Sequence, residues 1–193
     1  MSDKTLADLV RRAVRRAQED TRVAMPARVL SYDADKRLAR VQILQSEITD
    51  TGQTVEQPVV TDIPVMMPAG GGSGGITFPI KPGDEGMITF ADQDIGKWQT
   101  GGAAEAESGR RHSLTDGMFT PSQGRAAADS DNMVITFEGG TITMAPGGKV
   151  IIDAPGGIEF NGPSVKHNGI EIGDTHTHGG ILVGPDSTDV PDG

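Results

Sequence analysis

Two histidines near the C-terminal end are the residues of this 193-residue chain whose type and spacing best suit chemistry. His176 and His178 lie in the sequence Thr175-His176-Thr177-His178-Gly179-Gly180. In an extended strand, residues two positions apart point to the same face, so the two imidazoles can face one metal ion together. One copy of the chain leaves such a site incomplete, because zinc takes four ligands, or three with an open position.

Threefold symmetry would complete the site. Three copies of the chain would place six imidazole nitrogens around one axis, an octahedral set that suits iron(II) or nickel better than tetrahedral zinc. Such a closed site has no open position for a substrate or a water, so it would hold three chains together and would not catalyse a reaction. We therefore expect His176 and His178 to be ligands of a structural metal, and we assign no catalytic residue.

The segment before these histidines repeats a short strand followed by a tight turn. Apolar residues two positions apart recur between turns rich in glycine and proline. The pairs are Ile135/Phe137, Ile142/Met144, Val150/Ile152, Ile158/Phe160 and Ile170/Ile172. One such unit cannot bury its apolar face alone, and the segment is too short for a single-chain β-helix. We therefore predict a triple-stranded, intertwined trimeric β-helix over residues 131–172 and a metal-binding apex over residues 173–193.

The N-terminal part of the chain predicts a helix followed by a small barrel. Apolar residues at three- and four-residue spacing, from Leu6 to Ala17, predict an amphipathic helix within residues 1–23. Its arginines form either a solvated basic face or part of a docking element for a larger assembly.

From residue 24 to residue 100 the apolar period changes to two. This pattern predicts five strands, Ala27–Tyr32, Arg37–Leu44, Val59–Val65, Ile76–Phe78 and Gly86–Phe90. Pro58 and Pro64 favour an edge position for the third of them. Residues 101–130 are polar and glycine-rich, which indicates an irregular connecting segment. The fold class is therefore all-β: an OB-fold-like barrel and an intertwined trimeric β-helix, with a short N-terminal α-helix.

Composition and charge narrow the function classes. The chain has 27 glycines, 12 prolines, no cysteine and a net charge of −10. The missing cysteines exclude disulfides and cysteine-bound metal sites. The acidic balance and the 4% aromatic content disfavour nucleic-acid binding. We expect no signal peptide and no transmembrane segment. Two alternatives stay open: a carbohydrate- or nucleic-acid-binding adaptor of the OB-fold type, and a metal-dependent hydrolase that uses the histidine pair.

Three stretches of the sequence resemble the central spike proteins of contractile-tailed bacteriophages and related contractile particles. They are residues 83–86 with 90–98, residues 110–116, and the tip residues 173–180. The resemblance implies a homotrimer at the tip of the tail baseplate in the virion, assembled in the host cytoplasm. It implies that three His-X-His motifs, His176 and His178 here, bind one iron ion per trimer. It also implies that the N-terminal region binds baseplate hub or tail tube proteins, and that the spike pierces the host outer membrane. Further shaft ions occur in the family, but no residue here can be assigned to them.

Overall fold

The computed structural model describes residues 3–19, 21–49, 51–69, 73–102, 105–122 and 127–173. The chain forms two compact units, Met1–Ala126 and Ala127–Gly193, and each is described by itself. Within the described residues, no helix is long and apolar enough to cross a membrane.

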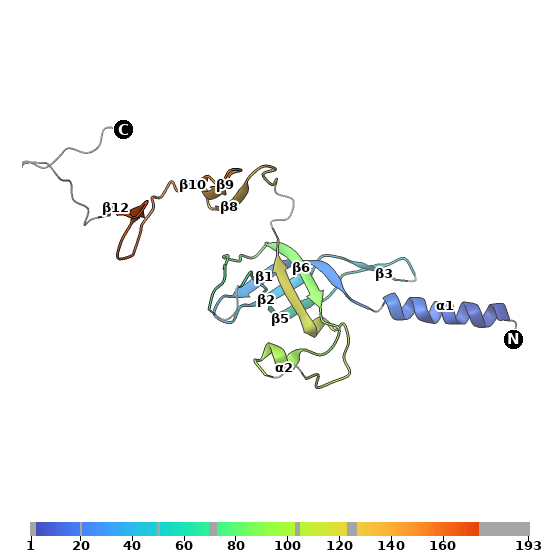
Figure 1. The fold of residues 1–193 in the computed structure, drawn as a ribbon. Coiled ribbons are helices and arrows are strands. Elements are labelled where there is room, and N and C mark those ends of the chain that lie inside the picture. The colour runs from blue at the N-terminus through green and yellow to red at the C-terminus, as the bar shows by residue number, and fades with distance from the viewer. Residues whose placement is uncertain are drawn as a thin grey trace, which may run out of the picture. The chain divides into compact units, whose positions relative to one another are not determined.

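Helix α1 (Asp3–Glu19) confirms the amphipathic helix that the spacing predicts (Figure 1). Its large apolar residues Leu6, Leu9, Val10 and Val14 are all more than half exposed. A single helix of this length gains little stability from its backbone alone, and most helices in proteins depend on packing of their apolar face. The apolar face of α1 therefore has no cover from the described part of its own chain.

The first unit is built around one five-stranded sheet (Figure 1). Its strands are β1 (Ala24–Asp33), β2 (Leu38–Ile43), β5 (Val59–Pro64), β6 (Glu85–Phe90) and β7 (Gly117–Pro121), in the order β5-β2-β1-β6-β7. All four neighbouring pairs are antiparallel. A short hairpin, β3 (Glu47–Ile48) with β4 (Thr54–Val55), extends from the loop after β2.

The sheet curls into half a barrel. The register of β1 against β2 shifts between Val29 and Ser31, and a bulge of this kind bends a strand and increases its twist. The curl brings the two edges of the sheet close, since Met66 donates its backbone N–H to the carbonyl of Phe119 at 2.8 Å. In the strand order of this sheet, β5 is an outermost strand beside β2, which is the edge position that Pro58 and Pro64 predict.

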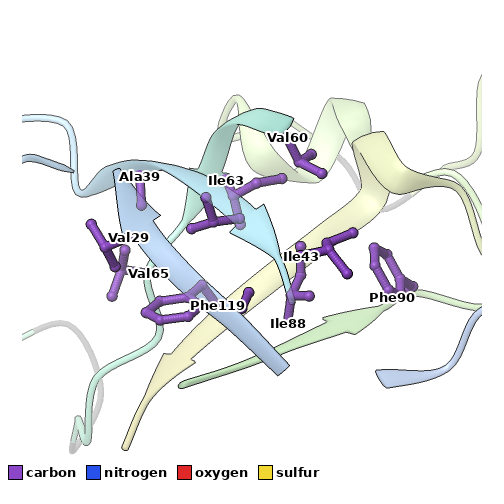
Figure 2. Packing of buried hydrophobic residues seen from close by; sticks show 11 residues of the cluster. Val29, Ala39, Ile43, Val60, Ile63, Val65, Ile88, Phe90 and Phe119 are labelled. Carbon is purple, nitrogen blue, oxygen red and sulfur yellow. The ribbon is translucent and has the colours of Figure 1, made fainter. Parts of the chain in front are cut away.

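Side chains from the inner face of this sheet form the hydrophobic core of the first unit (Figure 2). The buried apolar residues are Ala27, Val29, Ala39, Val41, Ile43, Val60, Ile63, Val65, Ile88, Phe90 and Phe119. They alternate with exposed residues along each strand, as the period of two requires. Phe119 stands opposite Ile88 in the ladder, and both are fully buried. Strand β7 is thus part of the core.

Two details of the first unit differ from the sequence prediction. Residues 117–121, expected in an irregular connection over 101–130, form β7 and pair with β6. The predicted strand Ile76–Phe78 is wrong, because these residues adopt no strand. The positions beside β2 and β6 in the sheet are taken by β5 and β7, so Ile76–Phe78 have no free sheet edge there to pair with.

The second unit carries a three-stranded antiparallel sheet, β8 (Met133–Phe137), β9 (Gly140–Met144) and β10 (Val150–Asp153) (Figure 1). These strands confirm the first three repeated apolar pairs. A fourth predicted strand at Ile158/Phe160 is absent from the described residues. A two-stranded hairpin of β11 (Lys166–His167) and β12 (Ile170–Glu171) follows.

The packing of Gly86 against β7 gives the first prediction. A Cβ at Gly86 would collide with the backbone oxygen of Thr120 and come within 2.7 Å of the Phe119 ring. We expect Gly86→Ala to lower the unfolding free energy of this unit by about 1–3 kcal/mol, the usual cost of overpacking. Urea denaturation measures the change. Gly109→Ala is the matched control, because a Cβ there meets nothing within 4 Å. Equal stabilities of the two variants would contradict the assigned core.

Candidate functional site

The predicted metal ligands His176 and His178 lie in residues 174–193, outside the part of the chain that the structure describes. Among the described residues, no three His, Asp or Glu side chains lie together as a metal site. The structure does describe how the chain approaches the predicted apex.

A tight hairpin immediately precedes the predicted apex. Asn168 (φ 48°) and Gly169 (φ 82°) turn β11 into β12, and two consecutive positive φ values are typical of a type I′ hairpin turn. The Glu171 Oε1 atom accepts the backbone N–H groups of Val165 and Gly173, at 3.1 and 2.8 Å. The backbone is therefore held by hydrogen bonds up to the residue before the histidine-containing segment.

The sheet β8-β9-β10 presents a continuous apolar surface, which we call the apolar face. Its register places Met133, Met144 and Val150 in one cross-strand row, and Ile135, Ile142 and Ile152 in the next. Phe137 extends the same side of β8. Each of these seven side chains is at least 40% exposed. The opposite side of the sheet carries three threonines and one carboxylate beside two apolar residues, namely Thr136, Thr141, Thr143, Asp153, Val134 and Ile151.

No residue of the described range 127–173 is buried. A large contiguous apolar patch on a soluble protein marks an interaction site or an aggregation hazard. A three-stranded sheet also needs a packed face for independent stability. The apolar face is therefore a candidate interaction surface among the described residues.

In the first unit, the segment after β6 is fixed by two buried carboxylates and a partly exposed arginine, which we call the carboxylate clamp. It consists of Asp94, Asp116 and Arg110. The side chains of Asp94 and Asp116 are 4% and 1% exposed. Arg110 donates Nε to Asp116 Oδ2 and Nη2 to Asp116 Oδ1, both at 3.1 Å, and its Nη2 also donates to Asp94 Oδ1.

Backbone groups complete the clamp. Asp116 Oδ1 accepts the N–H of Ile95 at 3.2 Å, and Asp94 Oδ1 accepts the N–H of Gly96 at 3.0 Å. These bonds hold the start of the short helix α2 (Gly96–Gln99) to the 3-10 helix η1 (Leu114–Asp116), which leads into β7. Buried carboxylates are tolerated when they are paired and hydrogen-bonded. The clamp therefore orders the loop that carries Trp98.

Hydrogen bonds shift the pKa values within the clamp. The Ser108 hydroxyl donates to Asp94 Oδ2 at 2.6 Å and, with the N–H of Gly96 and the charge of Arg110, lowers the pKa of the Asp94 carboxyl below 3.8. The hydrogen bonds to Asp116 raise the pKa of Arg110. Asp94 is therefore ionised at neutral pH and faces the guanidinium of Arg110. The hydrogen bonds of the clamp hold the backbone of Ile95 and Gly96 in place.

Sequence reasoning did not identify the clamp. Asp94, Arg110 and Asp116 lie within stretches that the family resemblance covers, but the pattern alone gives no sign that they meet. The hairpin at Asn168-Gly169 did have a local signal, since Asn-Gly between strands is the strongest short-range indicator of a hairpin.

Comparison with known protein families finds one matching model, described as "Phage protein Gp138 N-terminal domain", over residues 25–122. The match runs from β1 through β7 and includes the clamp, and it covers just over half of the chain. No curated protein matches the chain.

The hydrogen bond from Ser108 to Asp94 gives the second prediction. Because the folded pKa of Asp94 lies below 3.8, its ionisation stabilises the fold above pH 3.8, and this contribution is lost as the pH falls through the lowered pKa. We expect Ser108→Ala to be less stable than the unaltered chain at neutral pH, with a deficit that shrinks below pH 3.8. Unfolding free energies measured across this pH range test it.

Ser113→Ala is the matched control for that experiment. Its hydroxyl accepts the N–H of Thr115 at 3.3 Å and touches no carboxylate of the clamp. We expect its deficit to be the same at every pH in the range. A Ser108→Ala deficit that is equally independent of pH would contradict the assigned role of Ser108.

Proposed function

The chain belongs to the family of the phage protein Gp138 N-terminal domain, and from this premise we propose that it is the central spike of a contractile tail baseplate. In this proposal the matched unit is an OB-fold-like barrel at the base of the spike, and the second unit is its shaft. The spike pierces the host outer membrane when the tail sheath contracts. Among such spikes, the sequence likeness is to the short baseplate spike of phage Mu.

The exposed apolar face of β8-β9-β10 is the observation that carries this proposal. Seven large apolar side chains on one side of a small sheet call for a partner surface of matching length and chemistry. Two further copies of the same chain would supply it. Three such sheets, each with alternate side chains directed inward, would share one narrow core and cover each other's strand edges.

Intertwining suits the mechanical task of a spike. When the hydrogen bonds of each strand lie partly on a neighbouring chain, one chain cannot unfold locally without breaking contacts in two others. The low content of large apolar residues then matches a thin shaft, whose interior needs one inward side chain in two. The threonines of the opposite face, Thr136, Thr141 and Thr143, would face water.

We place an iron ion at the apex, held by His176 and His178 of three copies. The donor set of six neutral imidazoles fits a divalent transition metal in octahedral geometry. The ion would join three chain ends at the point of highest load, where termini otherwise fray. At the other end, helix α1 and the barrel would dock to baseplate hub or tail tube proteins. The proposal assigns no enzymatic activity, and it locates the chain at the baseplate tip of the virion.

The apolar face gives the third prediction. We expect light scattering to give a mass three times the 20.2 kDa of one chain. Ile142→Asn should reduce the trimer, because it places an amide in the centre of the shared core. Thr143→Asn is the matched control, since it lies on the same strand and points to the opposite side. A monodisperse monomer, or equal effects of the two variants, would contradict the shared core.

The histidine pair gives the fourth prediction. Metal analysis of the purified protein should find about one iron for every three chains, because each axial site takes two ligands from each copy. The double variant His176→Ala with His178→Ala should lose the metal and remain trimeric. His112→Ala with His167→Ala is the matched control and should keep it. Zinc in place of iron, or one metal ion per chain, would overturn the axial site.

A further inference from the structure

The first unit has an apolar hollow that its own core does not fill. It has a volume of about 440 Å³ and is lined by Met66, Asp94, Ile95, Trp98, Glu105 and Met118. Four of these six side chains are apolar, and Trp98 is 46% exposed. The carboxylate clamp fixes one wall, since it holds Ile95 and Gly96 by their backbone N–H groups. The hollow is therefore built on an ordered loop, next to the sheet edge at β7.

We propose that this hollow, which we call the Trp98 hollow, receives helix α1 of a second copy of the chain. Helix α1 and the Trp98 hollow are both apolar surfaces of the first unit that are exposed among the described residues. The proposal rests on the association of copies in the proposed function and adds a contact to it, at the barrel end of the assembly.

The width of the apolar stripe on α1 favours a hollow over a coiled coil. Leu6, Val10 and Ala13 follow the four- and three-residue spacing of a coiled-coil seam. Leu9 and Val14, however, occupy the flanking positions where coiled coils usually carry charged residues. A stripe this wide is typical of a helix packed into an apolar surface of a globular protein.

Charge complementarity supports the same partner. Glu105 and Glu107 share one cation, Lys97, at 3.9 and 3.8 Å, and the two clamp carboxylates share Arg110. The surroundings of the hollow therefore keep an excess of negative charge. Helix α1 carries an excess of basic residues, since it has five bases against three acids, Asp3, Asp8 and Glu19.

Geometry assigns the helix to another copy. The Phe90 N–H donates to the carbonyl of Val23, which fixes the C-terminal side of the α1 connection to the sheet. At 1.5 Å per residue, Leu6 and Leu9 lie about 20–25 Å from Val23 whichever way the helix points. Met118 pairs with Thr89, and Thr89 pairs with Ala24, so the hollow begins about two strand spacings, roughly 10 Å, from the joint. The near wall of the hollow is therefore less than half as far from the joint as Leu6 and Leu9 are, which favours a helix from another copy.

Cysteine crosslinking of the full chain tests the proposal, because the chain has no cysteine of its own. A chain with Leu9→Cys and Met118→Cys is assembled and oxidised, and its crosslinks are read on a non-reducing gel. We expect bonds between chains. Arg15→Cys with Met118→Cys is the matched control, because Arg15 lies about two and a half turns from Leu6, on the opposite face of α1. This control should give little crosslinking.

Trp98, the one tryptophan of the sequence, gives an independent readout. We expect Leu6→Gln with Leu9→Gln to shift its emission to longer wavelength and to raise its quenching by acrylamide, because the ring becomes wetter. Arg15→Gln should leave both unchanged.

The outcomes separate this proposal from the proposed function. Bonds between chains together with a Trp98 shift support it. Bonds within one chain, or a trimer that shows neither crosslinks nor a Trp98 shift, would overturn the seating of α1 and leave the trimeric spike intact. A monomer in light scattering would overturn both.

Discussion

The stability of the second unit depends on how the apolar face of the β8-β9-β10 sheet is removed from water. Seven large apolar side chains lie on one side of this sheet, and each is at least 40% exposed among the residues that the structure describes. The hydrophobic effect makes such exposure unfavourable in proportion to the apolar area left in water. An assembly of several chains could cover these apolar side chains. Such cover would explain why the second unit has cross-strand apolar rows and yet no buried residue in its described range.

The two units differ in how many apolar side chains they bury within one chain. In the first unit, a bulge in β1 and the contact between Met66 and Phe119 curl one sheet over its own inner face. Eleven apolar residues become buried without help from another chain. In the second unit, β8, β9 and β10 have four or five residues each and are joined by tight glycine turns, and no residue of the described range 127–173 is buried. In the proposed spike, the first unit would be a base with a core of its own, and the second would be a shaft whose core is shared between copies.

The carboxylate clamp connects the core of the first unit to its surface. Arg110 ties two buried carboxylates together, and the Oδ1 atoms that its Nη2 contacts also accept the backbone N–H groups of Ile95 and Gly96. The loop that carries Trp98 is thereby held in place by charge-assisted hydrogen bonds. Removing one partner would leave a buried charge uncompensated, so the cluster acts as a unit. An ordered Trp98 loop beside an apolar hollow suits contact with another chain better than contact with solvent.

The sequence by itself determined the local elements. Periods of 3.6 and 2 placed α1, β1, β2, β5 and β6, and glycine turns placed β8, β9 and β10, because side-chain direction in a helix or a strand depends on local geometry. The spacing of His176 and His178 likewise predicts, from these two residues alone, that both imidazoles bind one metal ion. Tertiary structure decided the rest. Strand β7 has one large buried side chain, Phe119, and a glycine at its other buried position, so its local signal is weak and its place depends on pairing with β6. The clamp depends on bringing Asp94 to Arg110 and Asp116, and only the curl of the sheet and the path of the loop bring these charges together.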